Sequence, residues 1–388
     1  MSARCLRWAL VIACVAAVGA LSSTQSSVAQ GTPKRPVAIT PTALQLAERA
    51  NQNTVTIISG TPAGTYLSVA YDMSAVLDSG DDLRILAIAG KGSLQNVRDI
   101  LHLKGVDMGI VQSDTLTLLK QTGELGSNIE SRLVYITKLY NEEMHIVAGP
   151  GIETLQDLAG KKVNFSDAGG GTELSARIVF DLLGVKVQQV NMGQADALVK
   201  LKSGEIAATV FVVGRPAAAL AKLPKDPDLR ILTVPYTQTL EDASYLPATL
   251  TSQDYPGLIP EGQSVETIAV GAVLAVYNWP RNTDRYRRVA NFVDALFGRF
   301  EEFQKPPRHA KWREVNLAAN LKGWQKFPAA QDWLDKIASQ TPPAPATTQR
   351  VDAVLARQQA ARAAPNNAAE QERLFKQFLE WSKAQQKQ

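Results

Sequence analysis

The chain has 388 residues, of which 45% are hydrophobic and 20% charged, proportions typical of soluble globular proteins. This composition excludes a disordered chain, a collagen-like repeat and a multi-span membrane protein, and the length suits two domains. The chain has 41 Lys and Arg and 37 Asp and Glu, so its net charge is only +4. This balance does not indicate a nucleic-acid partner.

The first 29 residues have the three parts of a secretory signal peptide. Two arginines open the segment, residues 8–21 are apolar, and small residues stand just before Gln30. The apolar run is shorter than the roughly 20 residues that a membrane-spanning helix needs. An uncleaved anchor and a lipoprotein cleaved at Cys14 are the alternatives. We expect residues 1–29 to be removed and the mature protein to be periplasmic.

Cysteine and histidine are scarce in the predicted mature chain. Cys5 and Cys14 both lie in the leader, so neither a disulfide nor a thiolate metal site is expected. His102, His145 and His309 do not show HxxxH or HxH spacing. We therefore expect no metal site, no cofactor and no Cys–His catalysis.

Beyond a lead-in at 30–51, which contains a short predicted helix at 42–50, strand and helix patterns alternate. In the first series, strands are expected at 55–58, 84–89 and 106–111, and helices at 66–77, 93–101 and 115–121. In the second series, strands are expected at 133–139, 144–148, 162–166, 186–190 and 208–213, and helices at 172–183, 195–203 and 216–223. Such alternation is typical of βαβ units with parallel strands, and two series predict two lobes.

The most continuous apolar run of the mature chain, 265–277, comes late in the sequence. It is too short to span a membrane as a helix and suits a fully buried strand. Helices are expected after it, at 284–303 and 310–321. The predicted fold class is α/β with two lobes. The predicted domains are lobe I at 52–137 plus 255–340 and lobe II at 138–254.

Residues 341–388 form a predicted Pro/Ala/Gln-rich linker followed by an amphipathic helix. One broad face of that helix carries the apolar side chains of Leu374, Phe375, Phe378, Leu379 and Trp381. The helix is interpreted either as a tail that docks on the chain's own surface or as a segment that binds a partner.

Three turns, 59–66, 112–115 and 166–173, each connect a predicted strand to a predicted helix. In parallel sheets such turns lie at the carboxyl ends of the strands, where ligands bind. Each helix start has up to four unpartnered N–H groups and a partial positive charge. A carboxylate can therefore bind there without an arginine.

The glycines at 169–171 allow the backbone to approach a ligand closely, because no Cβ intervenes. This turn lacks both the Gly-Lys-Ser/Thr of a Walker loop and a GxGxxG pattern, which argues against a nucleotide. A flexible turn is the alternative here, and simple helix capping is the alternative for Ser113 and Asp114. Tyr66 and Tyr140 suit either core packing or ligand contact. No GxSxG elbow marks Ser113 as a nucleophile.

Taken in order, these segments resemble the TAXI family, the extracytoplasmic solute receptors of TRAP transporters. The matching stretches are SGTPAGTY (59–66), GVDMGIVQSDT (105–115), YITKLYNEEMHIVAGPGIETLQDLAGKKVNFSDAGGGTELSARIVF (135–180) and VETIAVGAVLAVY (265–277). The resemblance implies a two-lobed, type II-like periplasmic-binding-protein fold whose chain crosses twice between the lobes, with a C-terminal helical extension added here. Ligand would lie in the cleft and the lobes would close over it.

The resemblance also implies a function and a set of contacts. Better-known relatives bind glutamate or dicarboxylates such as 2-oxoglutarate and deliver them to a permease that uses an ion gradient. Carried over by position, the candidate ligand-binding residues are Gly64, Thr65, Tyr66, Gln112, Ser113, Asp114, Tyr140, Gly170, Gly171 and Thr172.

We therefore expect a monomeric, non-enzymatic receptor that binds a small carboxylate or amino acid and delivers it to a TRAP permease. Alternatives are a receptor of the same fold serving an ABC transporter or a sensor kinase, an exported hydrolase, and a structural or chaperone-like envelope protein. The hydrolase alternative predicts a clustered nucleophile and base, and the sequence shows none.

Overall fold

A computed structural model of the chain describes residues 41–62, 64–340, 372–373 and 375–376. The predicted signal peptide and nearly all of the predicted C-terminal extension lie outside the described residues. Contacts divide the chain into two units, Met1–Ala47 and Glu48–Gln388. Helix α1 (Pro41–Gln52) spans the division, and every other element belongs to the second unit.

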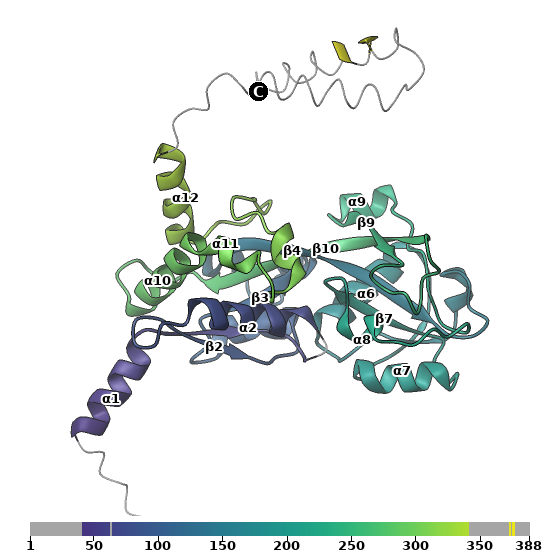
Figure 1. Ribbon diagram of the computed structural model, residues 1–388, viewed down its shortest axis with the longest axis horizontal. Coiled ribbons are helices and arrows are strands. Elements are labelled where there is room, and N and C mark those ends of the chain that lie inside the picture. Colours follow the sequence, from purple (N-terminus) through teal and green to yellow (C-terminus); the bar gives the residue numbers. More distant parts are fainter. Residues whose placement is uncertain (1–40, 63, 341–371, 374, 377–388) are drawn as a thin grey trace, which may run out of the picture. The chain divides into compact units, whose positions relative to one another are not determined.

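The strands of the second unit form one mixed sheet (Figure 1), in the order β2-β1-β3-β10-β4-β7-β5-β6, with β8 paired to β4 and β9 to β10. The pairs among β1, β2 and β3, and among β5, β6 and β7, are parallel. The strands are β1 (Thr54–Ile58), β2 (Arg84–Ile88), β3 (Met108–Gln112), β4 (Leu133–Ala148), β5 (Lys162–Asn164), β6 (Gln188–Val190), β7 (Ala208–Val213), β8 (Arg230–Ile231), β9 (Leu246–Thr251) and β10 (Ser264–Tyr277).

Helices connect these strands, and no helix of the described residues is long and apolar enough to cross a membrane. The helices of the first half are α2 (Thr65–Leu77), α3 (Ser93–His102), α4 (Ser113–Thr122), α5 (Ile129–Arg132), η1 (Gln156–Leu158), α6 (Gly171–Leu182) and α7 (Gln194–Lys202). Those of the second half are α8 (Ala218–Ala221), α9 (Gln238–Asp242), α10 (Asp284–Gly298), α11 (Phe300–Phe303), η2 (Ala310–Glu314) and α12 (Pro328–Gln340).

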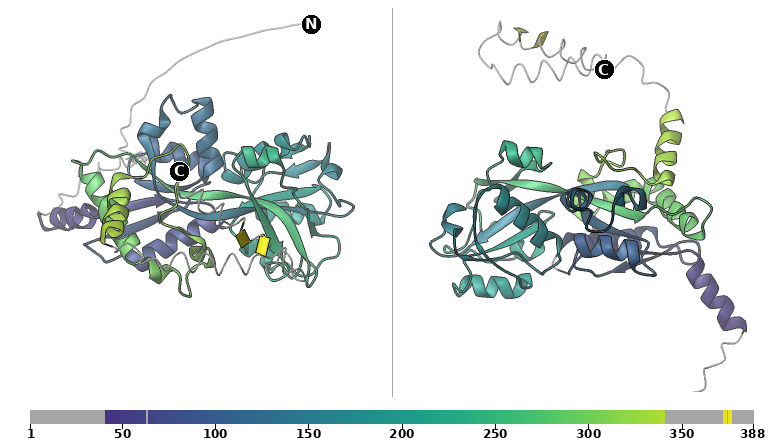
Figure 2. Two further views of the ribbon diagram at one scale, coloured as in Figure 1. Left: turned by 90° about the horizontal axis from the view of Figure 1, so that it is seen from above. Right: turned by 180° about the vertical axis from the view of Figure 1, so that it is seen from behind.

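Two long antiparallel strands, β4 and β10, are shared by two lobes (Figures 1 and 2). Lobe I comprises β1, β2 and β3 with the helices packed on them, and lobe II comprises β5, β6 and β7 with theirs. The second half of β10 pairs with β3 and its first half with β9, while β4 pairs with β7 from Glu143 to Ala148. The chain therefore crosses twice between the lobes, and the predicted α/β two-lobed fold is confirmed.

Each lobe has its own core, with helices on both faces of its part of the sheet. In lobe I one core contains Ile57, Val69 and Phe292, and another contains Val97 and Leu119. Lobe II repeats this arrangement, with α6 against one face and α7 and α8 against the other. Its cores include Val163, Val179 and Val210, and Leu201, Phe211 and Leu220. Since each lobe is packed separately, relative movement of the lobes does not require either core to open.

The two strands predicted at 133–139 and 144–148 are in fact one strand, β4, and this prediction was wrong. The intervening residues look like a break because Asn141, Glu142 and Glu143 are polar. They nevertheless pair with β10, from Ala269 to Gly271, and both glutamates are buried. Glu142 accepts a hydrogen bond from Tyr66 of α2 and Glu143 from Lys311 of η2, so both polar side chains have partners within an extended strand.

The helix predicted at 310–321 was also wrong, because only the short 3₁₀ helix η2 forms there. Lys311 and Trp312 are fixed by partners far away in the sequence: the indole N–H of Trp312 donates to Asp72 of α2 at 3.0 Å. Elements α5, β8, α9, β9 and α12 were not predicted. Strand β9 carries Pro247 and a mostly exposed pattern, so its sequence does not resemble a buried strand.

Candidate functional site

A small cavity of about 60 Å³ lies between loops of lobe I and lobe II. This volume matches about two water molecules and is far below the roughly 300 Å³ of a small ligand pocket. A ligand the size of an amino acid therefore enters only when the walls separate. The lining residues are Gly60, Thr61, Gly64, Thr65, Tyr66, Lys91, Gly92, Gln112, Glu142, Ser166, Asp167, Gly170, Gly171, Thr172, Val212 and Val213.

Two helices begin at this cavity, one from each lobe. Gly64 is the N-cap of α2 and Gly170 is the N-cap of α6, and neither helix receives a side-chain cap from the described residues. The first N–H groups of both helices thus lack intrahelical and capping partners, and each helix adds partial positive charge. This wall of the cavity suits an anion.

Position 171 requires a residue without a side chain, because lobe I and lobe II are in close contact there. A Cβ added there would lie 2.6 Å from the Ser93 hydroxyl and 2.9 Å from the side-chain amide carbon of Gln112. Thr172 packs on the other side, where its hydroxyl accepts a hydrogen bond from the Val212 N–H at 3.2 Å. The start of α6 is therefore held between lobe I and strand β7.

A buried acid also lines the cavity, next to the start of α2. The Tyr66 hydroxyl donates to Oε2 of Glu142 at 2.7 Å, and both side chains are buried. Burial raises the pKa of Glu142 to about 8, while hydrogen bonds from Tyr66 and Gln112 oppose that shift. Gln112 is itself fixed, because the Ser93 hydroxyl donates to its Oε1 at 3.0 Å. A carboxyl group thus forms part of the cavity wall, and it is mostly protonated near neutral pH.

Asp114 joins the two lobes behind the cavity. Its Oδ2 accepts hydrogen bonds from Ser175 of α6 at 2.6 Å and from the Tyr245 hydroxyl at 2.9 Å. Burial raises its pKa, and these hydroxyls oppose the shift. Asp114 is therefore a contact between the lobes and does not line the cavity.

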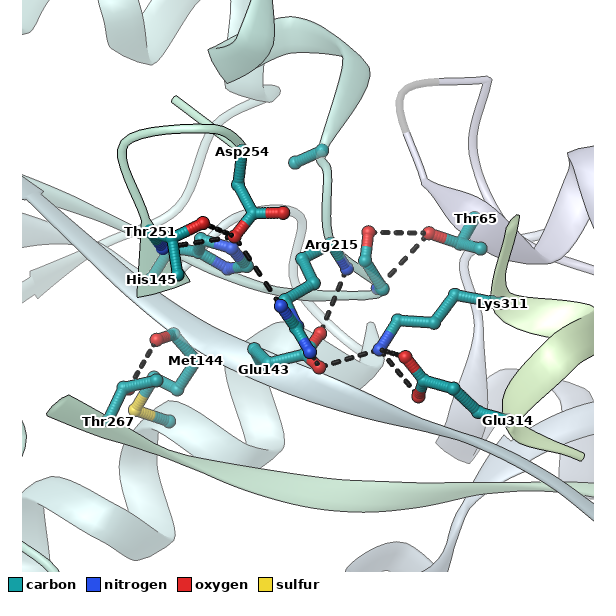
Figure 3. A network of polar contacts seen from close by, with 12 residues as sticks. Thr65, Glu143, Met144, His145, Arg215, Thr251, Asp254, Thr267, Lys311 and Glu314 are labelled. Atoms are coloured by element: carbon teal, nitrogen blue, oxygen red, sulfur yellow. Dashed lines mark hydrogen bonds and ion pairs between the residues drawn. The ribbon is translucent and has the colours of Figure 1, made fainter. Parts of the chain in front are cut away.

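Glu143, next to Glu142, anchors a network of charges where the lobes join (Figure 3). Lys311 of η2 donates to Glu143 at 2.6 Å, and the Arg215 backbone N–H donates to the same carboxylate at 2.9 Å. Lys311 also pairs with Glu314 at 2.8 Å. The Thr65 hydroxyl accepts from the Gly214 N–H at 3.1 Å. Lobe I and the chain after β7 are thus tied together at β4.

Seven of the ten predicted contact residues line the cavity. They are Gly64, Thr65, Tyr66, Gln112, Gly170, Gly171 and Thr172. The other three lie elsewhere: Ser113 is half-buried at the start of α4, Asp114 bridges the lobes, and the buried Tyr140 hydroxyl has no hydrogen-bond partner among the described residues.

Two of the lining residues, Glu142 and Lys91, were not predicted from the sequence. The sequence does carry a signal for Glu142, because two adjacent glutamates stand in the middle of a strand whose other residues are mostly apolar. Lys91, an exposed residue after β2, carries the only cationic side chain among the described residues that line the cavity. In the described ranges no group of three His, Cys, Asp or Glu side chains suits a metal ion.

A larger groove of about 720 Å³ lies in lobe II, between the segments 225–230 and 252–261. It is lined mainly by proline, leucine and exposed charged residues. It contains neither a helix start nor a buried carboxyl group of the kind found in the smaller cavity. The smaller cavity is therefore the better candidate site, despite its size.

Comparison with solved structures finds binding proteins at low sequence identity. The amino acid ABC transporter substrate-binding protein AbpA from Streptococcus pneumoniae, bound to L-arginine, is 15% identical over 64% of this chain and 90% of that chain, with a TM-score of 0.36. Periplasmic binding protein BugD is 13% identical over 74% and 94%, with a TM-score of 0.45. The aliphatic sulphonate binding protein SsuA from Escherichia coli is 18% identical over 79% and 85%, with a TM-score of 0.35. Residues 57–318, more than half of the chain, match the NMT1-like family.

Proposed function

Because the chain belongs to the NMT1-like family, we propose that it is a periplasmic solute receptor. In this proposal a small carboxylate ligand binds between the lobes, and the protein delivers it to a membrane permease of the TRAP type. The finer assignment to TRAP transport follows the resemblance of the QSD and GGGTE turns to the TAXI family. The protein then has no catalytic step of its own.

The observation that carries the proposal is the meeting of two uncapped helix starts at one cavity. The N-terminal N–H groups of α2 and α6 face it from different lobes, so one carboxylate bound there contacts both lobes. Hydrogen bonds to a charged group contribute roughly 1.5–3 kcal/mol each. Two or three of them support micromolar binding and favour the closed arrangement over the open one.

The proposed movement is a hinge within β4 and β10. The lobe bounds predicted from the sequence, 52–137 plus 255–340 and 138–254, place one boundary within β4 and the other before β10. Because the first half of β10 pairs with β9 of lobe II, we propose that the second hinge point lies within β10. Of the predicted contacts that do not line the cavity, Ser113, Asp114 and Tyr140, only the side chain of Asp114 is hydrogen-bonded to the other lobe in the described part of the chain, and in this proposal it holds the closed arrangement. The seven residues on the cavity wall contact the ligand.

A thermal-shift screen of the purified protein against organic acids and amino acids tests the receptor function. A ligand at about 100 times its Kd stabilises the folded state by about 2.7 kcal/mol when it binds only that state. A screen in which no acid or amino acid raises the melting temperature contradicts the proposal.

A pair of variants tests the backbone contacts. Gly171→Val places bulk against Ser93 and Gln112 and should abolish binding in a protein that still folds, because the clash is between lobes. Arg177→Ala, in the same helix but half exposed and paired with Glu173 at 3.7 Å, should leave binding within about twofold. The reverse result would replace the backbone contacts with an arginine clamp.

A further inference from the structure

We propose that Glu142 accepts the hydrogen bonds of a protonated nitrogen on the ligand, so that the site selects carboxylates that carry an ammonium group over those that do not. This inference rests on the proposed receptor function and narrows its ligand class. It assigns to Glu142 a specificity role that the helix starts alone do not supply.

Glu142 differs from most of the other buried acids in its partners. The described residues include five buried carboxylates, and a carboxylate away from water normally has a cationic partner. Three of them do: Asp72 pairs with Arg308, Asp107 with Arg285, and Glu143 with Arg215 and Lys311.

Glu142 and Asp114 form no ion pair with any described residue; hydroxyl and amide groups are their partners. Asp114 is nevertheless satisfied, because Ser175, Tyr245 and its own neighbour Thr115 all donate to it. Glu142 is the one of the two that lines the cavity. A cationic group on a ligand bound in the cavity can therefore become the partner that Glu142 lacks.

The cavity lining carries groups of both charge signs. The starts of α2 and α6, together with Lys91 at the rim, give part of the lining positive character. Glu142, next to the start of α2, and Asp167, just before α6, add carboxyl groups to the same lining. A zwitterion matches both kinds of group at once. A dicarboxylate that filled the same length would place a second negative group against Glu142.

The proton of Glu142 depends on the groups around it. They are Tyr66 from α2, Gln112 and Asp114 at the start of α4, and Tyr140 and Glu143 on β4, with Lys91 and Asp167 elsewhere in the cavity lining. None brings a cation into contact with it, and burial raises its pKa to about 8. A bound ammonium group favours the ionised form, so binding displaces the proton of Glu142 to solvent.

Linkage fixes the sign of the pH dependence. Below a pH of about 8 the free protein holds the proton and must lose it on binding, so affinity for an ammonium-bearing ligand rises by up to about tenfold per pH unit between roughly pH 6 and 8. A ligand that instead needs the neutral acid as a hydrogen-bond donor shows flat affinity in that range and weaker binding above it.

Titration calorimetry with matched ligand pairs tests the proposal. Glutamate is compared with glutarate, aspartate with succinate, alanine with propionate, and phenylalanine with 3-phenylpropionate. We expect at least one amino acid to bind roughly tenfold or more tightly than its partner. We expect Glu142→Gln to lose that preference and the rise of affinity with pH. Glu302→Gln, at an exposed helix position paired with Arg299, is the matched control and should keep both.

The outcomes separate this inference from the proposed function. If acids without nitrogen bind as tightly as the amino acids, Glu142 does not recognise an ammonium group. The same conclusion follows if Glu142→Gln retains the preference for amino acids. In either case the proposed receptor function stands. If no member of any pair binds to the folded protein, both proposals fail.

Discussion

Glu142 and Glu143 are neighbours on β4, equally buried, and their surroundings differ completely. Successive side chains of a strand point to opposite faces of the sheet. Glu143 meets Lys311 and Arg215, whereas Glu142 meets Tyr66 and Gln112 at a cavity. A carboxylate that is paired within the chain holds the fold together. One left without a cation costs stability, and the proposed ligand supplies its missing partner.

We expect the largest loss of stability when the ion pair of Glu143 is broken. Lys311→Met removes a cation whose side chain is only 1% exposed and leaves Glu143 buried with less compensation. Breaking a buried pair from one side typically costs about 3–5 kcal/mol. Urea unfolding should show that loss. Lys200→Met, which breaks the exposed pair with Glu205, should cost less than about 1 kcal/mol. Equal losses in the two variants would mean that the Glu143 network contributes little.

The lack of a cationic partner for Glu142 should affect how stability depends on pH. The pKa of Glu142 is higher in the folded protein, about 8, than its usual 4.5. The protonated acid therefore favours folding at low pH, and the free energy of unfolding falls as the pH rises from about 4.5 to 8. Glu142→Gln lacks this loss. Its stability relative to the parent protein should increase by up to about 1.4 kcal/mol per pH unit. A constant difference across this range contradicts the unpaired state of Glu142.

A third variant addresses the contact between lobes. Tyr245→Phe removes one donor from Asp114, which keeps Ser175 and Thr115. Losing a hydrogen bond to a buried acid should cost about 1–3 kcal/mol and should weaken ligand binding, because the closed arrangement loses a contact. Unfolding and calorimetry on the same sample measure both. Loss of stability with full affinity would place this contact outside the closing movement.

We expect the smallest effect from removing the hydrogen bond between Tyr66 and Glu142. Tyr66→Phe removes the hydroxyl that donates to Oε2 and favours the ionised carboxylate. The pKa of Glu142 should therefore rise further. The pH range over which affinity increases should move upward, by about one unit or less. An unchanged profile would show that this hydrogen bond does not control the proton.

The sequence predicted the parts of the fold that repeat locally. Helix α2 follows from apolar periodicity and strand β10 from a continuous apolar run. The turns at 59–66 and 166–173 each follow the carboxyl end of a parallel strand. They lie at one cavity because β4 and β10 run through both lobes and bring the carboxyl ends of β3 and β7 close together. Strand β4 was divided in two because burial of its polar centre depends on partners elsewhere. One of them, Lys311, lies 168 residues from Glu143.

The remaining site errors have the same origin. Asp114 looks like a ligand contact or a helix cap, since nothing nearby reveals that Ser175 and Tyr245 reach it from 61 and 131 residues away. In the sequence alone, Glu142 resembles a solvent-exposed charged residue. Its burial becomes evident only in the folded structure, where Tyr66 contacts it from 76 residues away. Local patterns locate the loops of a site, and the long-range packing decides which side chains face the ligand.

The central claim is that Glu142 lacks a cation until the ligand brings one, and the protons exchanged on binding test it most directly. Calorimetry at about pH 7 in two buffers of different ionisation enthalpy gives that number for the tightest-binding amino acid. A group with a pKa of about 8 is mostly protonated at this pH. We predict the release of about 0.9 proton per ligand from the parent protein and close to none from Glu142→Gln. Proton uptake, or equal release from both proteins, would contradict the account.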